Sequence, residues 1–413
     1  VYEKTRGNPF FVEEVIMSLK EEDVIFHEEN KWKIREVTRI EFPATVKSVI
    51  KTRINRLDDE CQNILTMASF VGNDFTFEAL CGVTGIEENT LLELMEKLLK
   101  TGLIKEKVIR GEDVYCFTDV MVKDVVHEEV SHLRHKKLHD SVGNALEKAY
   151  TKNVDQHFGE LAYHFLEAGD KDKALDYFLK AGERAKKLHA HDEAFSYLQH
   201  ALGLLEEQGN NLEKKARIIE ELGNLKWWMG EPHVCLEYWN RALDLWDQME
   251  DKKNVGRLHV WMGSLFWQSV GDKDKASRHH SMALEILQKE PESAELAGLY
   301  EDISHMLWRS GKPEALSWAQ KAYELAERLG NQQVLAGCYN DLGTISLKSG
   351  EHEKALKYYE QGLKMALKND LVGYGSSFYN NLATLYWTIG ELPKSFETAQ
   401  KGSELMRKAG SLY

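Results

Sequence analysis

The 413-residue sequence has few of the residues that cross-link or interrupt a chain. It contains five cysteines and six prolines, and no apolar run approaches the roughly 18 residues that a membrane-spanning helix needs. The cysteines lie far apart and form no Cys-x-x-Cys pair, which argues against a disulfide framework and a thiolate zinc site. We therefore expect a cytoplasmic protein with reduced, buried thiols.

Positive charge is also scarce. The chain carries 53 Lys and Arg against 67 Asp and Glu, a formal net charge of −14 at pH 7. Such a surface repels a phosphate backbone on average, so nucleic-acid binding would need a local basic patch. The abundant residues are Ala, Leu, Glu and Lys, which favour helix, and the 43% hydrophobic content is enough for cores in two or more domains.

The strongest pattern is an internal repeat in the second half. Glycines recur 39 to 41 residues apart, at Gly230, Gly271, Gly311, Gly350 and Gly390. An apolar–small pair precedes each glycine; the pairs are Leu222-Gly223, Met262-Gly263, Ile303-Ser304, Leu342-Gly343 and Leu382-Ala383. After each glycine, two small residues stand seven positions apart, as in Ala276 and Ala283, and so share one face of a second helix.

Each unit is therefore predicted to be a helix, a glycine-containing turn and a second helix, with small residues where helices cross. The pattern resembles the tetratricopeptide repeat, whose standard unit is about 34 residues, with longer helices here. At least five units run from about Leu212 to the end, and the register upstream is not fixed. The resemblance implies a right-handed superhelix that holds a protein or peptide on its concave side.

Residues 41–119 follow a different pattern. Segments 42–57, 61–72, 75–85 and 88–104 read as four helices. Two short alternating segments then flank Arg110-Gly111-Glu112 and predict a strand pair. Helices followed by two strands are typical of a winged helix.

The order of segments carries a second resemblance. A helix after Gly7-Asn8-Pro9, a strand pair around Trp32, the winged helix and helical repeats follow one another. This order resembles the C-terminal half of a STAND-class signalling ATPase of the maltose-activator or the cyclase- and kinase-associated type. The resemblance implies four parts: the end of an ATPase lid at 1–40, a winged helix at 41–120, connecting helices at 121–155 and a tetratricopeptide superhelix at 156–413.

The resemblance gives Gly7, Asn8 and Pro9 a role. In that family, the proline of the lid's Gly-x-Pro motif packs on the adenine of a bound nucleotide. The helix is then expected to contact ATP or ADP held by an ATPase core in the full-length protein, and this chain alone needs no cofactor. An ordinary capped helix start is the alternative. Asp119 departs from the family, because a histidine usually stands there near the phosphates, and we expect Asp119 to be a surface residue or a helix cap.

A group of histidines is the next pattern, and it predicts little chemistry. His132, His135 and His139 could share one helix face, but no acid or cysteine completes a zinc site, so metal binding is not expected. A mixed basic and apolar helix surface is the simpler reading.

Charge also argues against DNA binding by the winged helix. Residues 41–120 carry nine Lys or Arg and 14 Asp or Glu. Phosphate attraction is the main source of affinity in such modules, so nucleic acid is an unlikely partner.

Tryptophans recur in register on the first helices. Four of them each stand four residues after the small residue of their helix, a register that faces the concave surface in tetratricopeptide repeats. Neighbouring arginines are expected to hold carboxylates of an extended segment, and Glu220 and Glu301 to meet its basic residues. The expected partner-binding residues are Trp227, Trp267, Trp308, Trp387, Asn224, His305, Arg217, Arg257 and Arg309. The alternative is that the tryptophans are buried between repeats.

These patterns together predict a mainly α protein that senses and scaffolds. A partner or inducer bound by the superhelix would bias the nucleotide state of a STAND-type ATPase core in signal transduction. The alternatives are a stand-alone repeat adaptor for protein–protein interaction and a DNA-binding transcription regulator. A P-loop encoded upstream of Val1 would favour the STAND-type sensor over the stand-alone adaptor. A salt-dependent mobility shift of DNA would support the transcription regulator.

The sequence predicts that this chain is not an ATPase by itself. A P-loop needs Gly-x4-Gly-Lys-Ser/Thr, and the nearest segment is Ser310-Gly311-Lys312-Pro313 in a repeat turn. Purified protein with Mg-ATP should release phosphate no faster than buffer in a coupled phosphate assay. Turnover that disappears on a point mutation within this chain would contradict the prediction.

Overall fold

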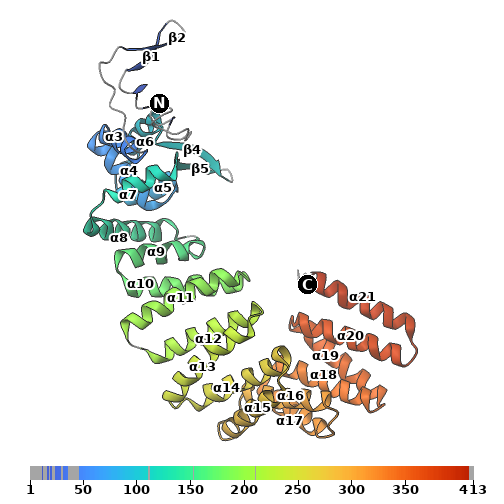
Figure 1. The fold of residues 1–413 in the computed structure, drawn as a ribbon. Coiled ribbons are helices and arrows are strands. Elements are labelled where there is room, and N and C mark those ends of the chain that lie inside the picture. The colour runs from blue at the N-terminus through green and yellow to red at the C-terminus, as the bar shows by residue number, and fades with distance from the viewer. Residues whose placement is uncertain are drawn as a thin grey trace. The chain divides into compact units, whose positions relative to one another are not determined.

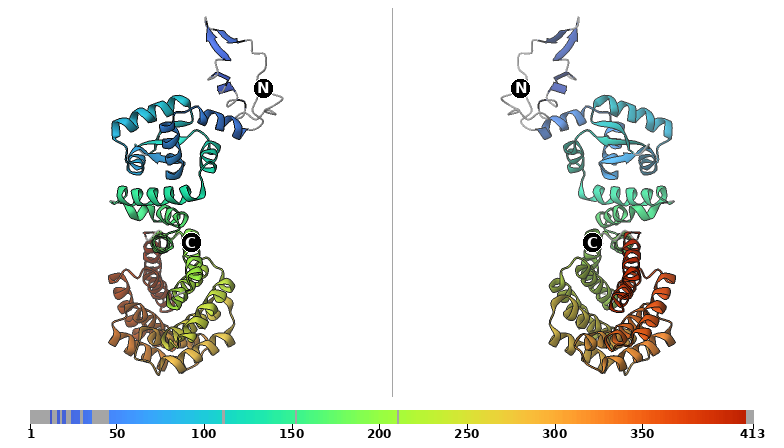
Figure 2. Two further views of the ribbon diagram at one scale, coloured as in Figure 1. Left: turned by 90° about the vertical axis from the view of Figure 1, so that its left-hand side faces the viewer. Right: turned by 90° about the vertical axis from the view of Figure 1, so that its right-hand side faces the viewer.

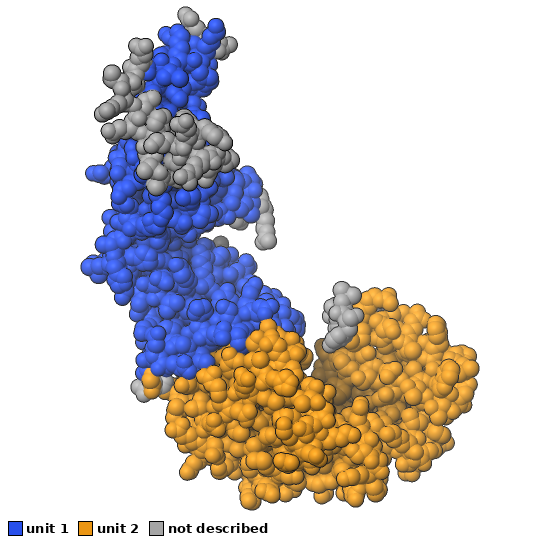
Figure 3. Space-filling view, viewed as in Figure 1, with its two compact units in different colours: residues 1–208 blue, residues 209–413 orange. Residues whose placement is uncertain are grey.

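The computed structural model describes residues 12, 16–17, 19–20, 24–28, 31–35, 46–109, 112–151, 153–209 and 211–408. Gly7, Asn8 and Pro9, the predicted lid motif, lie outside the described residues. The fold is mainly α-helical, as the sequence predicted. It divides into two compact units, residues 1–208 and residues 209–413 (Figures 1 and 3).

The first unit starts with a small antiparallel hairpin of β1 (Ile25–Glu28) and β2 (Lys31–Ile34). Trp32 stands opposite His27 in this pair, and the two rings meet edge to face with centroids 5.1 Å apart. The strand pair expected around Trp32 is therefore present.

A helical head follows the hairpin. Its helices are α3 (Val46–Asn55), α4 (Asp59–Val71), α5 (Phe77–Thr84) and α6 (Glu88–Thr101). Local signals set their ends: the Asp58 carboxylate accepts a hydrogen bond from the Cys61 amide at 2.7 Å and caps α4. Gly85 and Gly102 end α5 and α6 in the left-handed conformation, which glycine adopts without strain.

A three-stranded antiparallel sheet completes the head. The strands β3 (Asp74–Thr76), β4 (Ile104–Ile109) and β5 (Glu112–Phe117) are arranged in the order β3-β5-β4. β4 and β5 are the strand pair predicted around Arg110-Gly111-Glu112, with Ile104 opposite Phe117. β3 was not predicted, because three residues are too few to show an alternating pattern. The assignment of this head as a winged helix stays a prediction.

Helices continue to the end of the first unit. They are α7 (Val120–Glu128), α8 (His132–Ala149), the 3-10 turn η1 (Val154–His157), α9 (Phe158–Ala168), α10 (Lys171–Lys187) and α11 (His191–Gln208). The Asp119 carboxylate accepts a hydrogen bond from the Met121 amide at 2.8 Å and caps α7, so the helix-cap interpretation of Asp119 is confirmed. Within this unit, α8 packs on α9, α9 on α10 and α10 on α11.

Five helical hairpins form the described part of the second unit. Their helices are α12 (Leu212–Trp228), α13 (Pro232–Gln248), α14 (Lys252–Leu265), α15 (Lys273–Leu287), α16 (Ala294–Arg309), α17 (Ala315–Leu329), α18 (Gln332–Lys348), α19 (His352–Lys368), α20 (Val372–Thr388) and α21 (Leu392–Lys408). The five predicted turn glycines all have φ between 70° and 84°, a region that disfavours other residues. The predicted tetratricopeptide-type solenoid is thus confirmed.

One hairpin contains a π-helical turn. This turn, η2 (Phe266–Val270), continues α14 to Gly271. Gly263 precedes its turn glycine by eight positions, whereas Gly223 and Gly343 precede theirs by seven. The π-turn lies where the repeat has its extra residue.

Small residues lie where the two helices of a hairpin cross. A Cβ atom added to Gly223 would stand 2.5 Å from the Trp239 ring, and one added to Gly343 would overlap the Tyr359 ring. In each case a large aromatic side chain of the second helix packs against the backbone of the first. This close approach is what the apolar–small pairs in the sequence predicted.

The first helices of the hairpins form the inner layer of the second unit. α14 packs on α16, α16 on α18 and α18 on α20, whereas the second helices of neighbouring hairpins are more widely separated. Because one layer is closer together than the other, the array curves with its first helices on the concave side (Figure 2).

None of the described helices has both the length and the apolar character that crossing a membrane requires. All five cysteines are free thiols, and four of them are buried. Burial raises the pKa of the Cys235 thiol to about 12, so this residue behaves as a small apolar side chain.

Gly343→Leu should destabilise the second unit, because the new side chain would be forced against the Tyr359 ring. Overpacking of this kind costs about 1–3 kcal/mol, measurable by urea unfolding. Gly373→Ala on α20 is the matched control, because a Cβ atom there meets no other atom within 4 Å. Equal unfolding midpoints for the two variants would contradict the helix crossing.

Candidate functional site

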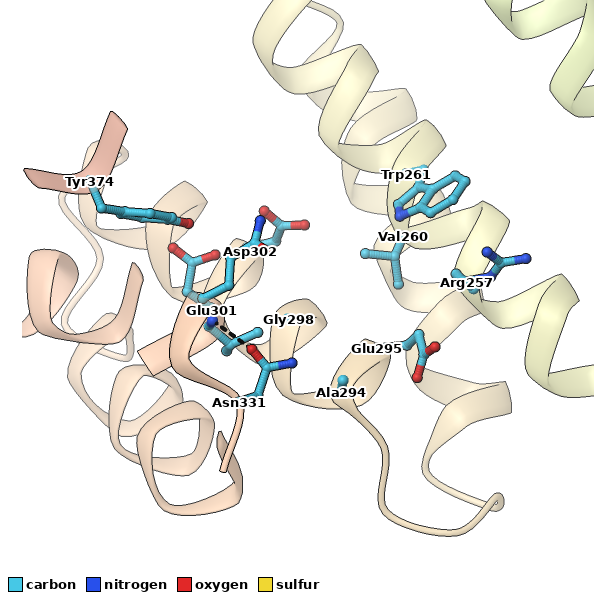
Figure 4. A pocket seen from close by; sticks show the side chains of 12 residues that line it. Arg257, Val260, Trp261, Ala294, Glu295, Gly298, Glu301, Asp302, Asn331 and Tyr374 are labelled. Carbon is cyan, nitrogen blue, oxygen red and sulfur yellow. Dashed lines mark hydrogen bonds between the residues drawn. The ribbon is translucent and has the colours of Figure 1, made fainter. Parts of the chain in front are cut away.

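A hollow opens on the inner layer of the second unit. Its volume is about 410 Å³, and it is lined by α14, α16, the start of α18 and one turn of α20. Figure 4 shows Glu301, Asp302 and Tyr374 on one side of the hollow and Trp261 and Arg257 on the other. We call this hollow the inner groove.

Three carboxylates from neighbouring inner helices gather beside the groove: Glu301, Asp302 and Asp341, which we call the acidic cluster. Asp302 accepts a hydrogen bond from the Ser264 hydroxyl at 2.6 Å. Its Oδ2 atom also lies 4.0 Å from Nε2 of His280, a buried histidine of α15. Two neighbours therefore fix the position of Asp302.

Asp341 is the most deeply buried member of the acidic cluster, with an exposed fraction of 0%. Its Oδ1 atom accepts a hydrogen bond from the Trp308 indole at 2.9 Å and lies 3.1 Å from Nδ1 of His305. Its Oδ2 atom has no hydrogen-bond partner within the part of the chain that the structure describes. One oxygen or nitrogen of each of Glu301, His305 and Asp341 lies within 4.8 Å of the others, so a cation fits among them.

Burial opposes ionisation of the acidic cluster. It raises the pKa of Glu301 well above its usual range, and the charges of Asp341 and Asp302 raise this pKa further. Burial also raises the pKa of Asp302 to about 6, although the Ser264 hydrogen bond favours the ionised form. Part of the cluster is therefore protonated near neutral pH, and a bound cation would reverse this.

The repeat explains why these residues meet. Asp302 and Asp341 each stand immediately before the apolar–small pair of their helix, and Trp261 occupies the same position on α14. Equivalent positions on neighbouring inner helices lie side by side when repeats stack. The sequence analysis named Glu301 but missed Asp302, Asp341 and Tyr374. An acid immediately before the apolar–small pair was the available signal.

The predicted tryptophans are at least partly accessible. Trp227, Trp267 and Trp308 are half-buried, and Trp387 is 68% exposed. The fully buried tryptophans of this unit include two on the second helix α13, outside the predicted set. A residue that binds a partner must be accessible, and these four tryptophans are at least partly so. Their contact with a partner stays a prediction.

The four tryptophans have different neighbours. Trp308 joins the acidic cluster through Asp341, and the Lys348 ammonium lies 4.4 Å from its ring centroid. Trp227 packs edge-on against Trp239 at 5.6 Å, and Trp267 lies within the π-turn. Among the four, only Trp308 hydrogen-bonds to a carboxylate of the cluster in the described structure.

Arg257 already has a carboxylate partner within the chain. Its guanidinium makes two contacts of 2.8 Å with Glu220, whose exposed fraction is only 4%. The Trp246 indole also donates to Glu220 at 3.2 Å, and Arg257 lies over the Trp261 ring at 4.8 Å. A partner's carboxylate would have to compete with Glu220 for Arg257.

The other predicted polar residues also have partners. Arg217 pairs with Glu213 at 2.9 Å on the exposed face of α12. Arg309 donates to Nε2 of His305 at 3.1 Å. The Asn224 side chain accepts a hydrogen bond from the indole of Trp239 at 3.0 Å. The structure thus brings His305 and Trp308 to the acidic cluster, and it leaves Arg217 and Asn224 elsewhere on the array.

Comparison with known proteins identifies the repeats. Residues 295–368 match the tetratricopeptide repeat family. A hybrid signal transduction histidine kinase G from Dictyostelium discoideum is 28% identical over 108 residues, or 25% of this chain. A peroxide stress-activated histidine kinase from Schizosaccharomyces pombe is 26% identical over 228 residues, or 50% of this chain. The chain covers only 3% and 9% of these two proteins.

Solved structures share the fold over nearly the whole chain. A STAND protein with a tetratricopeptide repeat sensor from Pyrococcus horikoshii has a TM-score of 0.50 and 17% identity, covering 98% of this chain and 56% of that one. Aspartyl phosphate phosphatase F from Bacillus subtilis has a TM-score of 0.50 and 13% identity, covering 98% of this chain and 95% of that one. The chain thus has a tetratricopeptide-type repeat fold, and identities this low establish the fold alone.

Asp302→Asn should stabilise the protein at neutral pH. The folded pKa of Asp302, about 6, is above the roughly 3.9 of an unfolded aspartate, so the folded state holds the proton more tightly. Its contribution to stability is therefore complete below about pH 4 and is lost as the pH rises through 6, a loss on the order of 2–3 kcal/mol. The amide removes the ionisation and still accepts from Ser264.

Urea unfolding at pH 5 and pH 7.5 measures this effect. The wild-type chain and Glu353→Gln, which loses an exposed acid on α19, should both be less stable at the higher pH. The difference between the two pH values should shrink in Asp302→Asn. The same pH dependence in all three proteins would show that Asp302 ionises normally.

Proposed function

We propose that the second unit binds a protein or peptide partner along its inner layer and that the partner places a Lys or Arg side chain in the inner groove. The observation that carries this proposal is the acidic cluster: partly protonated carboxylates at the edge of an open hollow, with one buried carboxylate oxygen unpartnered among the described residues. A cation at this place would neutralise the cluster and satisfy its oxygens.

The surroundings of the cluster fit such an anchor. Trp261 and Tyr374 line the same hollow, and aromatic faces attract cations. A volume of about 410 Å³ is in the lower range of ligand pockets, which suits one long side chain better than a folded domain. The half-buried Trp308 lies next to the cluster and offers apolar contact area to the rest of the partner segment.

We further propose that the chain is the sensor arm of a STAND-type signalling ATPase in the cytoplasm. The order of its segments supports this role, as does the fold-level similarity to a STAND protein with a tetratricopeptide repeat sensor. Partner binding would then bias an ATP- or ADP-bound core in the full-length protein. The chain itself would contribute binding and no catalysis.

A displayed library of random peptides, selected against the full chain, tests the groove. Selected peptides should carry a Lys or Arg anchor, and Glu301→Gln should weaken their binding by roughly tenfold or more, since hydrogen bonds to charged groups contribute about 1.5–3 kcal/mol. Glu353→Gln removes the same charge from α19 and should leave the affinity unchanged. Fluorescence anisotropy of labelled peptides gives the dissociation constants.

The pH dependence of the same binding gives a second readout. An incoming cation must displace protons from Glu301 and Asp302, whose pKa values burial raises, so affinity should rise from pH 5 to pH 7.5. Glu301→Gln should reduce this rise. Selection of acidic peptides, or binding unaffected by Glu301→Gln, would contradict the proposal.

A further inference from the structure

Four histidines of the first unit meet where α7, α8 and α9 join. His127 is on α7, His135 and His139 are one turn apart on α8, and His164 is on α9. One ring nitrogen of each of His127, His135 and His139 lies within 4.8 Å of the other two. Zinc binds imidazole nitrogens at about 2.0–2.1 Å, which separates them by about 3.3 Å, so small side-chain rotations would complete the coordination.

His139 has a nitrogen that the protein does not use. Its ring is 1% exposed, and its Nε2 atom has no hydrogen-bond partner among the described residues. Buried polar side-chain atoms are nearly always hydrogen-bonded, so an unpartnered nitrogen on a histidine beside two other imidazoles needs an explanation. A metal ion provides a partner for it.

His164 supplies the support that such a ligand requires. Its Nδ1 atom lies 3.0 Å from Nδ1 of His139, and its exposed fraction is 3%. When the His139 Nδ1–H group donates to His164, Nε2 of His139 presents a lone pair. Metal-binding histidines usually donate their second nitrogen to a neighbour in this way, which fixes both tautomer and orientation.

Aromatic packing encloses the histidines. Phe70 of α4 stacks on His127 with centroids 3.9 Å apart and closes one side of the cluster.

We propose that His127, His135 and His139 form a site for a divalent transition metal ion, with zinc as the first choice. Zinc fits three imidazoles and leaves a fourth position for water. The ion would join α7, which packs on the head, to α8, which begins the helical hairpins. The sequence analysis considered His132, His135 and His139 and did not expect metal binding; in the structure His132 is exposed, and the ring nitrogens that lie together belong to His127, His135 and His139.

Cobalt absorption tests the site directly. The full chain, first dialysed against a chelator, is titrated with Co²⁺ and then with Zn²⁺. The wild-type chain should develop a visible cobalt band that zinc abolishes, and zinc should raise its melting temperature as any ligand of the folded state does. The metal-free melting temperature of each variant shows whether it is folded.

Three variants separate the proposal from its alternatives. His127→Gln and His135→Gln remove half-buried ligands and should weaken zinc binding at least tenfold. His132→Gln removes an exposed histidine from the same helix and should bind as the wild type does. No cobalt band in the wild-type chain, or equal losses in His132→Gln and His135→Gln, would overturn the site and leave an aromatic packing cluster or adventitious surface binding.

Discussion

The close crossing of the two helices in each hairpin is the constraint on which the second unit depends. A large aromatic ring, such as Trp239 or Tyr359, packs on a glycine of the preceding helix. No larger residue fits at these glycines without moving the ring. Gly263 makes the same kind of contact with the His280 ring, and small residues recurring about every 40 residues let the helices of the other hairpins cross in the same way. Equivalent positions along the sequence thereby become neighbours in space.

The inner groove follows from this stacking. Asp302 and Asp341 are 39 residues apart in the sequence, and only the packing of α16 on α18 brings them together. Burying carboxylates is unfavourable unless they are paired, and here the pairing among the described residues is incomplete. An arrangement that lowers stability while offering negative charge to a hollow is typical of a binding surface rather than of a core.

Sequence reasoning succeeded where the physics is local. Turn glycines, small residues seven positions apart and the cap at Asp119 act within one hairpin or one helix end, so their spacing predicted the structure. Sequence reasoning failed where two separate elements of the structure meet. Tyr374 reaches the groove from a neighbouring repeat, and His127 reaches His135 across a corner between helices; no spacing along the chain encodes either contact. The exposure of Trp387 followed from its register, whereas the Arg257–Glu220 pair depended on how α12 and α14 lie.

The π-turn after α14 has a consequence for how such an array changes length. The repeat that contains it has one residue more than its neighbours, yet Gly271 still ends its helix with φ of 77°, like the other turn glycines. The extra residue is accommodated within a single turn, so every hairpin downstream keeps its phase. A one-residue insertion at this point is therefore compatible with the unchanged pattern of the remaining repeats. Its effect is confined to the side chains of Phe266–Val270, Trp267 among them, which provides a route for altering the concave surface within one repeat at a time.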